Sequence, residues 1–276
     1  MEYLQSNGLN MPRLGLGTFR MQGEVCRAAV ESALELGYRH IDTAAMYGNE
    51  DAVGAALAAS ALPRAALHVT TKVWHDQLAP DAIHRSFDAS LGQLGLDYVD
   101  LFMVHWPAAD MNLPAIFETL ERLREAGRTR AIGVCNFTVG MVRAVVEEIG
   151  IALACNQVEY HVLLEQTVMR RYLASRSMVL VAHCPLAQGR LAEHAELVSV
   201  AARHGATPAQ VALRWLLDQA GVAAIPKAQR RESQQANLDA LKLRLDDEDR
   251  RALCALPKDQ RFVTPPFAPA WDRAGD

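Results

Sequence analysis

Four side chains in the first half of the chain have the chemistry for proton transfer: Asp42, Tyr47, Lys72 and His105. A free phenol has a pKa of about 10, and a nearby ammonium group lowers that pKa because it stabilises the phenolate. Lys72, if buried, needs a charged partner, and Asp42 is a suitable one. His105 could orient a carbonyl group or relay a proton. Such a set could protonate a carbonyl oxygen while hydride reaches the carbonyl carbon.

Each of these residues also has an ordinary structural explanation. Tyr47 alone could be a surface tyrosine at the start of a helix, and Lys72 a lysine that extends to solvent. His105 could be a loop histidine and Asp42 a helix cap. The chemical interpretation depends on whether the surrounding elements bring the four side chains together.

Eight short apolar runs favour β-strands, and helical patterns separate them. The predicted strands cover residues 14–18, 38–41, 66–73, 98–104, 130–134, 152–158, 178–182 and 221–226. Polar residues lie at or just beyond the carboxyl ends of these runs: Asp42, Lys72, His105, Asn136, Gln157, His183 and Lys227. In a parallel barrel these strand ends converge on one face, where barrel active sites lie.

The alternation of strands and helices predicts an α/β fold with a parallel sheet. No Gly-x-Gly-x-x-Gly follows the first strand, so we expect a closed (β/α)8 TIM barrel in preference to a doubly wound sheet. The Asn7-Gly8 pair predicts a β-hairpin over residues 3–12 before the barrel. We also expect an extra C-terminal helix near residues 246–256 and an irregular tail, with residues 1–276 forming a single domain.

Composition narrows the function classes. The net charge of −4 and the pI near 6.1 argue against a nucleic-acid partner. The five cysteines are odd in number and form no C-x-x-C pair, which indicates reduced thiols in a cytoplasmic protein and no zinc site. No apolar run approaches the length of a membrane span. We therefore expect a cytoplasmic monomer with a small-molecule partner and no membrane or metal.

Several segments together resemble the aldo-keto reductase family: GYRHIDTAAMYGNE, VTTKVW, YVDLFMVHWP, IGVCNF, NQVEYH and IPK. They occur in the family's order and spacing, and the resemblance extends over essentially the whole chain. The lead-in LGLGTF and the tail PPFAPAWD further resemble the bacterial 2,5-diketo-D-gluconate reductase branch. The resemblance implies an NADPH-dependent carbonyl reductase in which Tyr47 donates the proton. Lys72 and Asp42 would tune Tyr47, and His105 would orient the carbonyl.

The resemblance also implies cofactor contacts, with Asn136 and Gln157 holding the nicotinamide carboxamide. The remaining expected cofactor positions are Gly17, Thr18, Asp42, Cys135, His183, Cys184, Leu186, Lys227, Ala228, Arg230, Arg231 and Asn237. Several residues depart from the family pattern. Cys135, Cys184 and Ala228 replace common serines, His183 replaces the aromatic residue that stacks on nicotinamide, and Ser233 replaces a common arginine. Arg230 and Arg231 could compensate by binding a 2′-phosphate.

The expected substrate pocket has an apolar wall made by Phe19, Trp74, Trp106 and Trp271, with His105 at its centre. This wall suits small aldehydes, α-dicarbonyls such as methylglyoxal, and keto sugars. Two other hypotheses remain open. One is a redox-sensing regulatory barrel that binds the cofactor with negligible turnover. The other is a metal-dependent hydrolase, for which His105, His183 and Asp42 are the candidate ligands.

Overall fold

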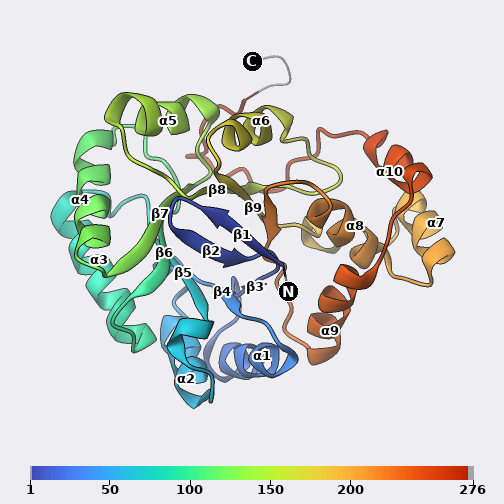
Figure 1. The fold of residues 1–276 in the computed structure, drawn as a ribbon, viewed down its shortest axis with the longest axis horizontal. Helices are drawn as coiled ribbons and strands as arrows, with labels where there is room; N and C mark the ends of the chain where they lie inside the picture. Colours follow the sequence, from blue (N-terminus) through green and yellow to red (C-terminus); the bar gives the residue numbers. More distant parts are fainter. Residues whose placement is uncertain (1, 273–276) are drawn as a thin grey trace.

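Eight parallel strands surround the centre of the molecule, and helices form an outer ring around them (Figure 1). The structure, a computed structural model, describes residues 2–272. The strands pair in chain order: β3 (Leu16–Gly17), β4 (His40–Asp42), β5 (His68–Val73), β6 (Val99–Val104), β7 (Thr129–Cys135), β8 (Cys155–Glu159), β9 (Val179–His183) and β10 (Val222–Ala224). Parallel bridges from Leu14 to Ala224 and from Gly17 to Lys227 join the two outer strands. The sheet therefore closes, and the expected (β/α)8 barrel is confirmed.

The helices follow the strands as the sequence pattern predicts. They are α1 (Gly23–Leu36), α2 (Glu50–Ala59), α3 (Pro80–Leu94), α4 (Leu113–Glu125), α5 (Val139–Arg143), α6 (Thr167–Ser175), α7 (Ala195–His204), α8 (Pro208–Leu217), α9 (Arg231–Asp239) and α10 (Asp247–Cys254). A π-helical segment, Ala144–Ile149, continues α5. α7 and α10 are additions to the barrel pattern and pack against each other. No helix within residues 2–272 combines the length and apolar content needed to cross a bilayer.

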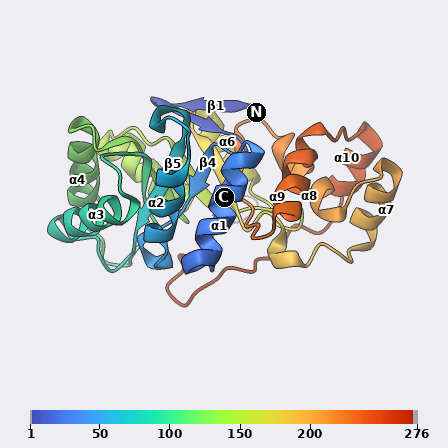
Figure 2. The same ribbon diagram turned by 90° about the horizontal axis from the view of Figure 1, so that it is seen from below.

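The two ends of the barrel are covered differently. The predicted N-terminal hairpin is present as β1 (Tyr3–Ser6) and β2 (Leu9–Pro12). It lies across the amino ends of the strands, where Ser6 Oγ donates a hydrogen bond to the carbonyl of Ala154. Leu9 and Met11 are buried against the apolar side chains that fill the barrel. The C-terminal tail, residues 257–272, crosses the opposite end (Figure 2), so the carboxyl ends of the strands meet beneath it.

The strands on either side of the closing seam are shorter than the sequence predicts. β3 contains two residues where we expected residues 14–18, and β10 contains three where we expected 221–226. Pro226 has no N–H to donate to a neighbouring strand. A Cβ atom at Gly17 would lie 2.6 Å from the carbonyl oxygen of Ile225. The segments of β3 and β10 thus approach each other closely at the seam where the barrel closes, but they form only isolated bridges there.

Candidate active site

Asp42, Lys72, Tyr47 and His105 lie together at the carboxyl end of the barrel. The Lys72 ammonium, which is fully buried, donates to Asp42 Oδ1 at 2.5 Å and to the Thr43 carbonyl at 2.9 Å. It also lies 3.5 Å from the Tyr47 hydroxyl. The rings of Tyr47 and His105 are 5.5 Å apart between centroids. The structure thus brings the four predicted residues into one cluster.

A short connection between β4 and α2 presents the Tyr47 phenol. A single 3-10 turn, Ala45–Tyr47, follows β4 and ends at Gly48, whose φ of 61° suits a residue without a Cβ atom. The buried Asn49 side chain fixes this turn from below. It accepts a hydrogen bond from Thr43 Oγ1 at 2.8 Å and donates to the carbonyl of Thr18 at 3.0 Å. The phenol is therefore held on a supported turn at the end of a strand.

Burial and charge act in opposite directions on the Tyr47–Lys72 pair. Burial raises the pKa of Tyr47 above its usual value, and Lys72 only partly reverses that rise. Burial alone would lower the pKa of Lys72, but Asp42 raises it above its usual value. At neutral pH the lysine is therefore charged and the phenol protonated. The expected lowering of the Tyr47 pKa by Lys72 is present as one contribution, but burial outweighs it.

His105 is neutral at physiological pH. Burial and the nearby Lys72 charge keep the pKa of His105 well below its usual range. Its Nδ1 atom is buried and has no hydrogen-bond partner among the described residues. A neutral imidazole at this place can form a hydrogen bond to a carbonyl group without bringing a second positive charge next to Lys72.

The amide side chains expected to hold a carboxamide form a network at the ends of β7 and β8. Gln157 Nε2 donates to Asp42 Oδ2 at 2.8 Å. Asn136 Nδ2 donates to the His105 carbonyl at 3.0 Å, and its Oδ1 accepts from His183 Nε2 at 2.9 Å. The Cys135 thiol lies 3.7 Å from Gln157 Oε1. Each amide keeps unused hydrogen-bonding capacity, so this donor and acceptor set fits a nicotinamide carboxamide.

The loop after β9 adopts strained backbone conformations close to this network. Cys184, Ala187 and Gln188 all have positive φ, between 49° and 55°. Such angles are costly for residues other than glycine and cluster where ligands bind. His183, at the strand end, is half-buried, and burial lowers its pKa to about 4. Its ring is therefore uncharged at neutral pH, and Leu186 lies half-buried in the same loop.

The basic residues after β10 have different partners. The Arg231 guanidinium forms an ion pair with Glu35 of α1 at 2.7 Å, which directs it away from the strand ends. Arg230 and Lys227 are exposed. The Lys227 ammonium donates to the Arg20 carbonyl at 3.4 Å, and the Arg230 side chain forms no hydrogen bond or ion pair among the described residues. Asn237 is buried on α9 beside the hydroxyl of Tyr38. The Arg230 side chain is thus available to an anion, and the exposed Lys227 has only one long hydrogen bond to a carbonyl, whereas Arg231 has a charged partner.

The remaining predicted contacts lie where the strand ends meet the barrel seam. Thr18 is buried, and its hydroxyl donates to the Asp42 carbonyl at 3.0 Å. Gly17 bridges to Lys227. Ala228 is also buried, and its carbonyl accepts a hydrogen bond from Gln234. These positions shape the backbone around the cluster more than they offer side chains to a ligand.

Aromatic side chains surround the mouth of the cluster. Trp74 contacts the His105 ring at a centroid distance of 5.0 Å, and Phe19 contacts Tyr47 at the same distance. Trp106 lies 6.0 Å from Trp271 of the tail. The four predicted aromatic residues thus form part of one apolar wall.

Sequence reasoning missed Phe267, which contacts two residues of this wall. Its ring is 5.8 Å from Trp74 and 5.6 Å from Trp106. It also packs at 4.1 Å against His75, a second residue that the sequence analysis did not select. The tail has no periodic pattern to indicate which side chains face inward. The one sequence signal in the tail was its aromatic and proline content, and from it we selected only Trp271 as a pocket residue.

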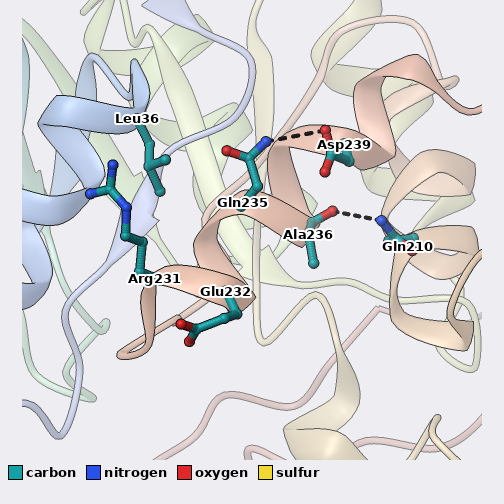
Figure 3. A pocket seen from close by; sticks show the side chains of 7 residues that line it. All are labelled: Leu36, Gln210, Arg231, Glu232, Gln235, Ala236 and Asp239. Carbon is teal, nitrogen blue, oxygen red and sulfur yellow. Dashed lines mark hydrogen bonds between the residues drawn. The ribbon is translucent and has the colours of Figure 1, made fainter.

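A separate hollow of about 420 Å³ lies on the outside of the barrel between α1, α8 and α9 (Figure 3). Leu36, Arg231, Glu232 and Gln235 line it. It is open to solvent and contains none of the four clustered residues. Within residues 2–272, no group of three or more histidine, cysteine, aspartate or glutamate side chains is arranged to hold a metal ion.

The fold and the cluster at its carboxyl face agree with what comparison with known proteins shows. Residues 13–256 match the aldo/keto reductase family, and the chain belongs to that family of oxidoreductases. It is 38% identical over 266 residues to methylglyoxal reductase DkgB of Escherichia coli O157:H7, covering 95% of this chain and 99% of that protein. It is 39% identical over 256 residues to glyoxal reductase of Bacillus subtilis strain 168, covering 92% of each.

Solved structures agree with the sequence relatives. A crystal structure provisionally assigned as a 2,5-diketo-D-gluconic acid reductase B superposes with a TM-score of 0.95 at 38% identity, covering 99% of this chain and 98% of that one. An aldose reductase from Schistosoma japonicum superposes with a TM-score of 0.91 at 28% identity, covering 98% of both chains. The predicted family resemblance is therefore confirmed.

Proposed function

We propose that the protein is an NADPH-dependent reductase of small aldehydes, α-dicarbonyls and keto sugars. The observation that carries the proposal is the buried Lys72–Asp42 pair directly below the Tyr47 hydroxyl. The similarity to methylglyoxal and glyoxal reductases supports the substrate class. NADPH, when bound, would supply hydride to the carbonyl carbon.

The chain's own residues would handle the proton. Tyr47 donates its hydroxyl proton to the carbonyl oxygen as the carbon accepts hydride, and the product is an alcohol. The resulting phenolate is stabilised by the Lys72 ammonium, which Asp42 holds in place. The neutral His105 ring orients the carbonyl, and the aromatic wall keeps water from the reacting atoms.

The amide network and the basic residues would hold the cofactor. Asn136 and Gln157 would bind the carboxamide, and the His183 ring would lie against the nicotinamide. Lys227 and Arg230 would bind the 2′-phosphate. We further propose that residues 1–276 act as one domain and as a monomer. The five cysteines are unpaired in the structure, which supports a reducing, cytoplasmic environment.

Substitution of Tyr47 by phenylalanine tests the proposal. The change removes the proton and keeps the ring, so we expect kcat to fall by about 10²- to 10⁴-fold, the usual contribution of a positioned acid. NADPH oxidation would be followed by absorbance with methylglyoxal and a panel of aldehydes and keto sugars. NADPH affinity should change little.

Three results would contradict parts of this assignment. Equal turnover in wild type and Tyr47→Phe would mean that another group is the acid. Tight NADPH binding without turnover in the wild type would favour the regulatory barrel. Loss of activity with a chelator would favour metal-dependent chemistry.

A further inference from the structure

His75, in the loop after β5, adds a polar group to the aromatic wall. Its imidazole packs on Trp74 at a centroid distance of 4.8 Å and on Phe267 at 4.1 Å. The planes of the His75 and Phe267 rings are inclined by 33°, so the two rings are close to stacked. These contacts fix the imidazole at the mouth of the cluster. The reaction proposed above gives it no role.

The imidazole nitrogens of His75 are available to a ligand. Within residues 2–272 neither nitrogen forms a hydrogen bond or an ion pair, and neither is among the buried polar atoms that lack a partner. The side chain is half-buried, so its nitrogens reach the solvent while part of the ring is covered. An imidazole has an N–H donor in its neutral form as well as in its charged form. His75 can therefore donate a hydrogen bond in either protonation state.

Trp74 connects His75 to the cluster at the strand ends. The same indole that packs on His75 contacts the His105 ring at 5.0 Å. The two imidazoles are thus near neighbours, joined by one indole ring. Electrostatic effects agree with this placement: burial is the largest cause that lowers the pKa of His105, and a charge on His75 is a smaller one. A substrate whose carbonyl lies against His105 can extend along Trp74 and present its other end to His75.

We propose that His75 is a specificity-determining residue for carbonyl substrates that carry a second oxygen-containing group. Its N–H donates a hydrogen bond to a hydroxyl or carboxylate oxygen at the end of the substrate away from the reacting carbonyl. Both groups accept such a bond, and a carboxylate accepts it more strongly because it is charged. An apolar substrate of the same length gains nothing from the imidazole. The inference rests on the proposed function, because it places the reacting carbonyl between Tyr47 and His105.

Two alternatives give His75 no part in substrate recognition. In the first, Trp271 is the donor, because its Nε1 atom also has no hydrogen-bond partner among the described residues. That atom is buried, however, and Arg261 lies over the Trp271 ring at 3.9 Å, so a substrate reaches it only if the tail moves. In the second, His75 merely supports Phe267 through its ring. This packing role is the alternative that an experiment must separate from donation.

Three benzaldehydes that differ only in the group opposite the aldehyde test the proposal. They carry a carboxylate, a hydroxymethyl group or a methyl group, and the methyl compound has no acceptor. His75→Phe keeps an aromatic ring against Phe267 and removes both nitrogens. We expect it to raise KM for the carboxylate substrate by about 10-fold, the lower end of what a hydrogen bond to a charged group contributes. The rise for the hydroxymethyl substrate should be smaller, about 3-fold. KM for the methyl substrate should stay close to the wild-type value, as should kcat for all three.

His75→Gln is the conservative variant, because it keeps an N–H donor and loses the aromatic ring. If donation matters, this variant should retain the preference for the two polar substrates over the methyl substrate. If His75 only packs against Phe267, His75→Gln should be the more damaging change and should affect all three substrates alike. His84→Phe is the matched control, because His84 is a half-buried histidine on α3 with no ring contact to the wall. It should show wild-type KM values.

The outcomes separate this inference from the proposed function. If the wild type reduces neither methylglyoxal nor any of the three benzaldehydes with NADPH, the proposed function is wrong, and the role of His75 with it. If the wild type reduces them and His75→Phe leaves every KM unchanged, or raises all three equally, only the role of His75 is overturned. A rise for both polar substrates supports donation to either kind of oxygen. A rise for the carboxylate substrate alone supports the proposal and identifies the acceptor as a charged group.

Discussion

Arg230 and Arg231 are neighbours with the same charge, yet only one of them is available to a ligand. The Arg231 side chain is paired with Glu35, whereas the Arg230 side chain has no partner in the described part of the chain. If Arg230 binds the 2′-phosphate, Arg230→Ala should raise the Kd for NADPH by about 10-fold or more, since hydrogen bonds to charged groups contribute about 1.5–3 kcal/mol. Affinity for NADH should not change. Fluorescence titration with both cofactors measures this.

Arg231→Ala is the control for that comparison. It removes the same charge and breaks an exposed ion pair, which contributes little to stability. The ratio of NADPH to NADH affinity should therefore stay at the wild-type value. Equal losses in the two variants would mean that only the general positive charge of this segment matters.

Sequence reasoning located the strand-end residues well but not the direction of surface side chains. Asp42 and Lys72 were located because they lie at or near the carboxyl ends of predicted strands, which converge on one face of a parallel barrel. Arg231 could not be assigned in this way, since its partner is 196 residues away in the chain. Phe267 was missed for a related reason. The tail is irregular, so its sequence has no periodic pattern from which the direction of each side chain can be inferred.

At the scale of elements, α2 and α3 pack unusually closely at one glycine. A Cβ atom at Gly54 would lie 2.6 Å from the carbonyl oxygens of Gln93 and Leu94. Helix propensity alone predicts that Gly54→Ala stabilises the protein. The backbone contact predicts the opposite, and we expect a loss of about 1–3 kcal/mol in the free energy of unfolding. Urea denaturation provides the measurement.

Gly92 of α3 offers a matched comparison. Nothing lies within 4 Å of a Cβ atom built there. Gly92→Ala should therefore stabilise the protein by about 0.5–1 kcal/mol, the ordinary helix effect. A stabilising effect of Gly54→Ala would show that α2 and α3 can separate without cost.

The element boundaries that were predicted least well are those at the seam. Residues 14–18 and 221–226 have clear strand patterns, and the structure places both in the barrel. Only the middle of each run pairs regularly, because Pro226 lacks a donor and Gly17 packs directly on a carbonyl. Local propensity contains no information about either constraint, since both arise from the approach of two distant segments.

For the molecule as a whole, buried histidines predict sensitivity to acid. His40 and His68 lie inside the barrel with ring centroids 4.5 Å apart. Burial lowers the pKa of His40 to about 4 and that of His68 well below its usual range. In the unfolded chain both take up protons near pH 6.5. Between pH 6.5 and 4 the unfolded state therefore binds more protons, so the free energy of unfolding falls as the pH falls.

For His40 alone, the free energy of unfolding should be about 2 kcal/mol lower at pH 5 than at pH 7. His40→Gln should reduce the difference in the free energy of unfolding between pH 5 and pH 7, and His68→Gln should do the same. His84→Gln, on α3 outside the barrel, is the control and should keep the wild-type difference. Urea denaturation at both pH values measures it. An identical pH dependence in all four proteins would exclude the barrel histidines as its source.

The seam also has a consequence for the order in which the protein is assembled. Arg13 donates a hydrogen bond to the Val222 carbonyl, a contact between residues 209 apart in the chain. Contacts of such long range form slowly, because the intervening chain must first be brought together. On the ribosome, the growing sheet keeps β3 as an open edge until β10 has emerged. Chaperones that recognise unpaired strands should therefore bind this protein late in synthesis. They should release it when the segments of β3 and β10 pair and close the barrel.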